Sequence, residues 1–88
     1  MWLESIVEKL WRKHRIEQRE VAEVFGAAPQ FRFVARGHRA GEDIYAAFGQ
    51  TAGGRYLIGF FVHRRDGRAL ILSARDMTDS ERRRHERG

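Results

Sequence analysis

Cysteine, proline, lysine and long apolar runs are scarce or missing: the sequence has no cysteine, one proline and two lysines. The lack of cysteine excludes disulfide bonds, thiolate nucleophiles and cysteine-bound zinc, and it fits a reducing cytoplasm. The longest uninterrupted apolar stretch, residues 56–62, is far shorter than the ~20 residues of a membrane-spanning helix. We therefore expect a cytoplasmic protein without a signal peptide or membrane association.

The length and composition are those of one folded domain. A chain of 88 residues cannot divide its apolar side chains between two cores, so we expect a single domain over residues 1–88. With 42% hydrophobic and 33% charged residues, the chain is not of a disordered type.

The charge is concentrated in arginine and in the C-terminal half. Fifteen of the seventeen basic residues are arginine, whose planar guanidinium pairs with phosphate or carboxylate at two points. Residues 1–50 hold eight basic and seven acidic residues, a net charge of +1, whereas residues 51–88 hold nine and five, a net charge of +4. A polyanion is therefore the first partner to consider.

Hydrophobic periodicity predicts an α+β fold in the order ααββββα. Apolar residues at 3, 6, 7, 10 and 11, continued by His14, form one helical stripe, and a second stripe runs from Ile16 to Phe25 before Pro29. Strands are expected at 31–36, 42–48, 55–64 and 68–75, with a loop at 37–41. Asp66-Gly67 predicts a two-residue type I′ turn. Thr78 and Glu81 form a capping box that starts a basic tail helix.

Strand alternation predicts which side chains share a face of the sheet. The Asp66-Gly67 turn pairs Ile58 with Arg75, Phe60 with Ser73, Val62 with Ile71 and Arg64 with Ala69. Closing the loop GQTAGG between Phe48 and Arg55 adds Asp43, Tyr45 and Tyr56 to the same face. We expect the opposite face to lie under the helices and to gather Ile44, Phe48, Leu57, Phe61, Leu70 and Leu72. The first face is then wetter and available for chemistry.

A family resemblance appears once the C-terminal segments are taken together. The string GRYLIGFFVHRRDGRALILSARDMTDSERRRHE, with WRKHRI and EVAEVF upstream, resembles the BrnT family of bacterial type II toxins, which are ribonucleases with a RelE-like fold. The most specific parts are Lys13-His14, Gly54-Arg55, and Ser73-Ala74-Arg75 followed by Thr78 and Glu81-Arg82.

The resemblance implies a compact ribonuclease whose partners are RNA and a cognate ribbon-helix-helix antitoxin of the BrnA type. In that reading operator DNA is bound mainly through the antitoxin. Two departures stand out. The family commonly has glycine after the Lys-His pair, where this chain has Arg15, and commonly tyrosine near the end of the last helix, where this chain has His85.

RNA cleavage without a metal needs a base for the 2′ hydroxyl, cations around the phosphorane and an acid for the 5′ oxygen. Arginines supply only the cations, because they keep their protons near neutral pH. Arg75 is the first candidate, since it ends the last strand just before a helix N-terminus that also favours phosphate. Arg64, at the end of the preceding strand, is the second. The competing roles are a salt bridge from Arg75 to a nearby aspartate (Asp43, Asp76 or Asp79) and a merely solvated Arg64.

Histidine is the natural proton carrier near neutral pH, and His85 and His14 are the candidates closest to the arginines. A surface pair with Glu81 or Arg82 would also explain His85, and a packing or capping role would also explain His14. The residues expected to bind substrate are Arg55, Tyr45, Tyr56, Ser73, Arg82 and Arg83. No pair of histidines or acidic cluster has metal-ligand spacing, so we expect no metal and no other cofactor.

Two functions from different classes remain open at this point. One is an endoribonuclease toxin of a type II toxin-antitoxin system that cleaves RNA without a metal and is neutralised by its antitoxin. The other is a non-catalytic basic module that only binds an antitoxin or RNA.

Overall fold

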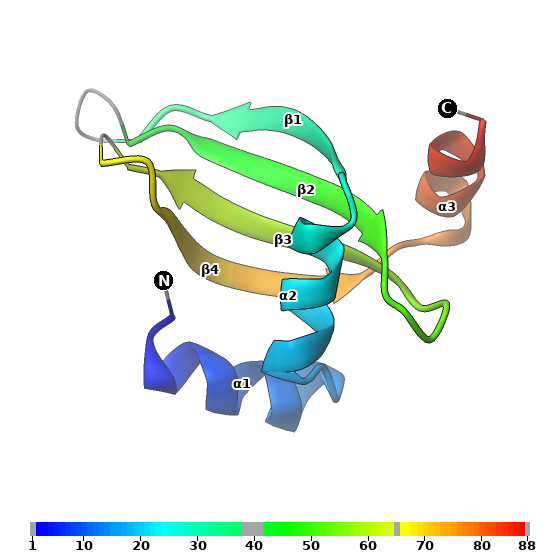
Figure 1. Ribbon diagram of the computed structural model, residues 1–88, viewed down its shortest axis with the longest axis horizontal. Helices are drawn as coiled ribbons and strands as arrows, with labels where there is room; N and C mark the ends of the chain where they lie inside the picture. The colour runs from blue at the N-terminus through cyan, green and yellow to red at the C-terminus, as the bar shows by residue number, and fades with distance from the viewer. Residues whose placement is uncertain (1, 38–41, 65, 88) are drawn as a thin grey trace.

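A computed structural model describes residues 2–37, 42–64 and 66–87; the loop predicted at 37–41 lies almost entirely outside these ranges. The elements are α1 (Glu4–His14), α2 (Gln18–Gly26), β1 (Gln30–Ala35), β2 (Ile44–Gln50), β3 (Tyr56–His63), β4 (Ala69–Asp76) and α3 (Asp79–Glu86). The strands form one antiparallel sheet in the order β1-β2-β3-β4 (Figure 1). The predicted ααββββα arrangement is confirmed. No helix in the described part of the chain is long and apolar enough to cross a membrane.

The corner between α1 and α2 depends on one residue in the left-handed conformation. Arg15 caps α1 with a φ of 53°, and its N–H donates to the carbonyl of Trp11. α2 then begins with a reciprocal capping box between Glu17 and Glu20, which satisfies backbone N–H groups that a helix start leaves unpaired. Arg15 occupies the position where the resembled family commonly has glycine, the residue that adopts positive φ without steric cost.

We therefore expect Arg15→Gly to raise the free energy of unfolding by about 0.5–1 kcal/mol. Glycine removes the clash between a β-carbon and the backbone at positive φ, an advantage that exceeds the extra freedom it gives the unfolded chain. Urea denaturation of the two proteins measures the difference. Arg15→Ala keeps the β-carbon and removes the same guanidinium, so a gain of equal size in that variant would contradict the backbone explanation.

The main core lies between the two N-terminal helices and one face of the sheet. It is built from the buried residues Leu10, Ile16, Val21, Val24, Leu57 and Ala74. α1 packs against β4, and α2 packs against β2 and β3. Two glycines permit this approach: a β-carbon on Gly49 would lie 2.8 Å from Val24 Cγ1, and one on Gly59 would lie 3.1 Å from Phe25 Cε2. We call this face, which carries Leu57, Gly59 and Phe61, the helix face.

The predicted register between β2 and β3 is wrong by three residues. Thr51 N–H donates to the carbonyl of Arg55 at 2.8 Å, so Phe48 lies opposite Ile58 and Tyr45 opposite Phe61. Because three is an odd number, every side chain of β2 lies on the face opposite to the one predicted. Tyr45 is on the helix face, and Ile44 and Phe48 are on the other.

The hairpin between β3 and β4 also departs from the predicted two-residue turn. The Arg64 N–H donates to the carbonyl of Arg68, and of Asp66 and Gly67 only the glycine has a positive φ. A bulge in β4 follows: Phe60 pairs with Ser73 and the next residue, Phe61, pairs with Ile71, so Leu72 is the extra residue of β4. Phe60 is paired with Ser73 and Ile58 with Arg75, as predicted, but beyond the bulge the pairing shifts by one residue.

This shift changes two predicted pairings and the face on which two side chains lie. Val62 pairs with Leu70 rather than Ile71, and Ala69 pairs with His63 rather than Arg64. Leu70 therefore leaves the helix face, where it was expected, and Ile71 joins that face opposite Phe61. Phe61, with 6% of its surface exposed, and Leu57, with 1%, are in the core as predicted.

The opposite face of the sheet, which carries Tyr56, Ile58, Phe60, Ser73 and Arg75, we call the Arg75 face. The tail helix α3 turns back over part of it. Thr78 and Glu81 form the predicted capping box, with N–H to oxygen distances of 3.2 and 2.9 Å. The ring of His85 packs edge-on against Tyr56, with 6.1 Å between the ring centroids. In Figure 1, α3 follows β4 at the end of the sheet and stands apart from α1 and α2. α1 and α2 thus pack against the helix face, whereas α3 contacts the Arg75 face through single side chains such as His85.

Candidate functional site

Arg75 is partly exposed on the Arg75 face and is held by α3. Its Nη1 and Nη2 donate to the two carboxylate oxygens of Glu81 at 2.8 and 3.0 Å, and Nη1 also donates to the carbonyl of Asp76. The guanidinium lies over the ring of Phe60 at 5.8 Å. Its partner is thus Glu81 and not the side chain of an aspartate. Nε–H and one Nη2–H have no partner within the described ranges, so one edge of the fork remains open to a ligand.

A two-point pair between a guanidinium and a carboxylate has the geometry of a guanidinium bound to phosphate. The open edge of Arg75, formed by Nε–H and one Nη2–H, offers an anionic ligand the same two-point geometry. The hydrogen bond from Arg75, followed by that from the Thr78 N–H, lowers the pKa of Glu81 from its usual 4.5 to about 2.

His85 and Tyr56 lie beside this pair. Nδ1 of His85 is the one buried side-chain nitrogen or oxygen without a hydrogen-bond partner in the described part of the protein. Buried polar atoms are normally paired, so an orphaned imidazole nitrogen needs a functional or structural explanation. The guanidinium of Arg82 lies over the ring of Tyr56, 4.4 Å from its centroid. The same guanidinium pairs with Glu86 at 3.1 Å.

A small crevice, about 50 Å³ in volume, lies between α3 and the edge of the sheet. Its walls are Gln30 and Arg32 from β1, Phe48 from β2, and Glu81, Arg84 and His85 from α3. We call these six residues the α3 crevice. None of the β1 side chains was predicted as a site residue. Alternation along FRFVAR places Arg32 on the face opposite Phe31 and Phe33, but nothing in the sequence brings that face to α3.

Arg55 has a structural position instead of an open one. Its Nε and Nη2 donate to Asp76 at 2.7 and 3.0 Å, and its Nη1 donates to Glu20 at 3.3 Å. Nη1 and Nη2 also donate to the main-chain carbonyls of Arg15 and His14 at 2.8 and 3.0 Å. All five N–H groups are thereby engaged, so Arg55 fastens the corner between α1 and α2 to β4 and has no donor left for RNA.

The other predicted residues are divided between several parts of the molecule. Ser73 lies on the Arg75 face two residues before Arg75. Arg64 follows β3, six residues beyond the partner of Arg75, or about 20 Å along the strand, so the structure separates these two arginines. His14 ends α1 with an exposed side chain, and Arg83 is exposed on α3.

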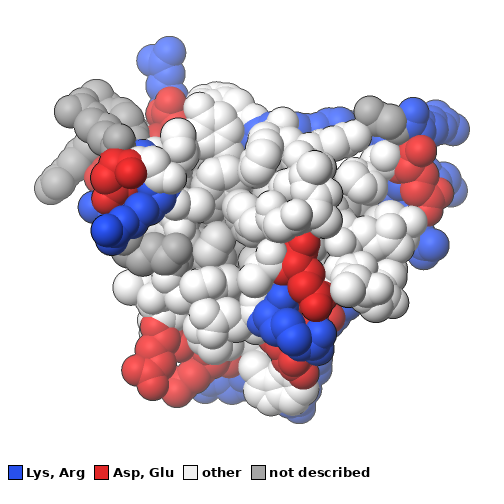
Figure 2. Space-filling view, viewed as in Figure 1, with Lys and Arg blue, Asp and Glu red and all other residues white. Residues whose placement is uncertain are grey.

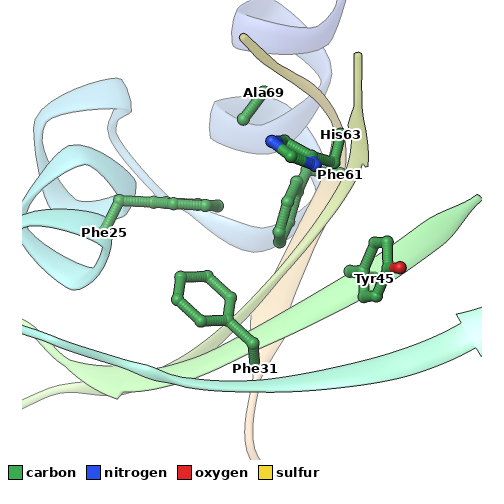
Figure 3. Close-up of a pocket in the computed structure, with 6 residues that line it drawn as sticks. All are labelled: Phe25, Phe31, Tyr45, Phe61, His63 and Ala69. Atoms are coloured by element: carbon green, nitrogen blue, oxygen red, sulfur yellow. The ribbon is translucent and has the colours of Figure 1, made fainter. Parts of the chain in front are cut away.

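Tyr45 lines an apolar cavity on the helix face and is therefore remote from Arg75. The cavity, about 330 Å³ in volume, is also lined by Phe25, Phe31, Phe61, His63 and Ala69. Figure 3 shows the rings of Phe25, Phe31 and Phe61 turned toward this common space. Phe61 contacts the other two with 5.2 and 5.7 Å between ring centroids. This position separates Tyr45 from the residues of the Arg75 face that were predicted with it to bind substrate.

Charge is unevenly spread over the surface. Figure 2 shows a mostly white middle bordered by blue and red atoms, at the end where Figure 1 places α3 and also at the left and in the lower part of the view. No group of three or more His, Asp or Glu residues able to hold a metal ion occurs within residues 2–37, 42–64 and 66–87.

The pair between Arg75 and Glu81 predicts a specific acid response. A carboxylate whose pKa is depressed on folding stabilises the folded state above its unfolded pKa, and this stabilisation is lost as the pH falls through the folded pKa. For Glu81 the window runs from 4.5 down to about 2. We expect wild-type protein to exceed Glu81→Gln in stability by about 1 kcal/mol at neutral pH, a modest value because the pair is partly exposed.

The difference in free energy of unfolding between wild-type protein and Glu81→Gln should disappear as the pH falls from 4.5 to about 2, which denaturation experiments at several pH values would measure. Arg75→Gln removes the other partner and should show the same closure. A stability difference that persists at pH 2 would mean that the pair does not account for it.

The chain matches one known family over nearly its whole length. No curated protein matches it. The model of a family described as ribonuclease toxin, BrnT, of type II toxin-antitoxin system matches residues 2–81. The match includes both helices of the core, the whole sheet and the Arg75–Glu81 pair, and it ends four residues before His85. The chain therefore belongs to the BrnT family of ribonuclease toxins of type II toxin-antitoxin systems.

Proposed function

We propose that this protein is an endoribonuclease that cleaves RNA on the Arg75 face without a metal ion. Arg75 holds the scissile phosphate, with Arg82 adding positive charge beside it. Tyr56 and Ser73 line the same face. His85 transfers the proton.

The proposed reaction is internal transfer of the phosphate. The 2′ oxygen loses its proton to a base and attacks the adjacent phosphorus, and the bond from phosphorus to the 5′ oxygen breaks. The products are a 2′,3′-cyclic phosphate and a 5′ hydroxyl, which receives a proton from an acid. Imidazole can serve in either role near neutral pH. The guanidinium of Arg75 stabilises the negative charge that develops on the phosphorane.

One observation carries this proposal. The Arg75 face brings together a guanidinium with an open edge and a histidine whose buried Nδ1 has no partner in the described residues. Arg75 pairs with Glu81 of α3, His85 belongs to α3 itself, and Tyr56 of the Arg75 face lies beside the histidine. A cation and a group that can carry a proton are the two kinds of residue that metal-free RNA cleavage requires in one site.

The family also supports a proposed partner. We infer that a cognate antitoxin of the ribbon-helix-helix class neutralises the ribonuclease in the cytoplasm and carries most of the operator binding. The net charge of +4 over residues 51–88 suits an RNA substrate or an acidic protein partner.

The test is an RNA cleavage assay in excess EDTA. We expect unchanged cleavage and products that end in 2′,3′-cyclic phosphate. Loss of activity in EDTA that added Mg²⁺ restores would contradict the metal-free mechanism. RNA binding without any cleavage, together with normal growth of cells expressing the protein alone, would favour the non-catalytic binding module.

A further inference from the structure

We propose that the α3 crevice is a second phosphate subsite, which binds a phosphate of the RNA strand next to the scissile one. This inference rests on the proposed function, because it extends the same substrate beyond Arg75. The ligand is defined by its chemistry: a phosphate group joined through one nucleotide to the phosphate held by Arg75.

Arg32 and Arg84, the two arginines of the α3 crevice, differ from Arg55 and Arg75 in their ion pairing. Arg55 and Arg75 are both paired with carboxylates. Arg32 and Arg84 both line the crevice, and neither forms an ion pair with any residue in the described ranges. Two guanidinium groups that line one small space repel each other, and the one carboxylate that lines the same space, Glu81, is already paired with Arg75, so a bound phosphate would relieve the repulsion.

The other polar side chains that line the crevice are Gln30, His85 and Glu81. Gln30 adds an amide that can donate to an oxygen, and His85 adds an imidazole whose Nδ1 has no partner. Glu81 also lines the crevice, but its oxygens already accept from Arg75 and from the Thr78 N–H. The lining is thus rich in donors, as an anion site requires.

The position of Arg32 and the volume of the crevice both suit a phosphate. The guanidinium of Arg32 lies over the ring of Phe48, 5.3 Å from its centroid. Packing on an aromatic face restricts the long side chain while its N–H groups point outward in the guanidinium plane. A volume of about 50 Å³ suits a small group such as a phosphate and not a nucleobase.

The crevice is continuous with the proposed cleavage site. Glu81 pairs with Arg75 and also lines the crevice, and His85 lines the crevice while packing against Tyr56. An RNA strand whose scissile phosphate contacts the open edge of Arg75 would therefore have a neighbouring phosphate close to Arg32 and Arg84.

The experiment compares dinucleotides with and without an added terminal phosphate. Binding is measured with 2′-O-methyl dinucleotides, which cannot be cleaved, carrying either a 5′-phosphate, a 3′-phosphate or neither. We expect one of the two phosphorylated forms to bind the wild-type protein about tenfold or more tightly than the unphosphorylated form. The form that gains shows on which side of the scissile bond the crevice lies.

Arg32→Gln and Arg84→Gln should each abolish most of this gain while leaving the affinity for the unphosphorylated dinucleotide near its wild-type value. Arg12→Gln, an exposed arginine on α1, is the charge-matched control and should keep the gain. Equal binding of all three dinucleotides, or an equal loss in Arg12→Gln, would overturn the subsite.

Cleavage assays with the matching 2′-hydroxyl dinucleotides separate this proposal from the function on which it rests. Cleavage of all three at equal rates would leave the ribonuclease standing and remove the subsite. A phosphate-dependent gain in binding without cleavage of any of them would support the subsite and refute the ribonuclease.

Discussion

Arg75→Ala is expected to abolish RNA cleavage and to weaken RNA binding, whereas His85→Ala should reduce cleavage by ~10²- to 10⁴-fold and leave binding nearly unchanged. The two outcomes differ because the guanidinium holds the phosphate in both the ground state and the transition state. Proton transfer, in contrast, stabilises only the transition state. Single-turnover cleavage and binding to a 2′-O-methyl RNA measure the two effects separately.

Arg75 also holds α3 through Glu81, so a structural loss must be distinguished from a chemical one. Arg75→Lys keeps the charge without the two-point fork, and we expect weakened binding with cleavage still strongly impaired. Glu81→Gln breaks the same pair while it leaves Arg75 in place. If Glu81→Gln inactivated the enzyme as completely as Arg75→Ala, the effect would lie in the position of α3 and not in the guanidinium.

His14→Ala tests the alternative proton carrier. His14 ends α1, and its main-chain carbonyl accepts a hydrogen bond from Arg55. The same guanidinium pairs with Asp76, the residue after Arg75. Loss of cleavage in His14→Ala with full activity in His85→Ala would reassign the proton transfer to His14. Full activity in the double variant would exclude both histidines as proton carriers.

Arg55→Ala is expected to lower the free energy of unfolding by about 2–4 kcal/mol, the largest stability effect of any single arginine that we describe. The substitution removes hydrogen bonds to two carboxylates and to two carbonyls at the helix corner. It leaves Glu20, whose side chain is 16% exposed, partly buried without its cation, and unpaired buried groups are costly. For a small domain this is a large share of a total of about 5–15 kcal/mol.

Urea denaturation of Arg55→Ala provides the measurement, with an unchanged m value indicating that both states keep their compactness. Arg68→Ala, a matched change at an exposed hairpin position, should alter stability by no more than ~0.5 kcal/mol. Arg55→Lys keeps the charge but cannot reach all these partners, and we expect an intermediate loss. A wild-type stability in Arg55→Ala accompanied by lost RNA binding would instead support the role first predicted for this residue.

The sequence by itself determined the order and type of the elements. The apolar stripes, the break near Arg15, the capping box at Thr78 and the glycine of the last hairpin are local signals, and each depends on residues within a few positions of one another. The predicted pairing of Ile58 with Arg75 is also correct. The hairpin loop shifts the register by one residue, and the bulge after Phe60 cancels that shift.

Only the tertiary structure decided which side chains meet. The glycine-rich loop between β2 and β3 can close in several registers at similar local cost, and the contact of Gly49 and Gly59 with α2 selects the one observed. The same packing sends Tyr45 to the helix face and fastens Arg55 to the corner between α1 and α2. The docking of α3 brings His85 and Arg84 to Arg32, about fifty residues away in the chain, because long-range packing and ion pairing leave no periodic pattern in the sequence.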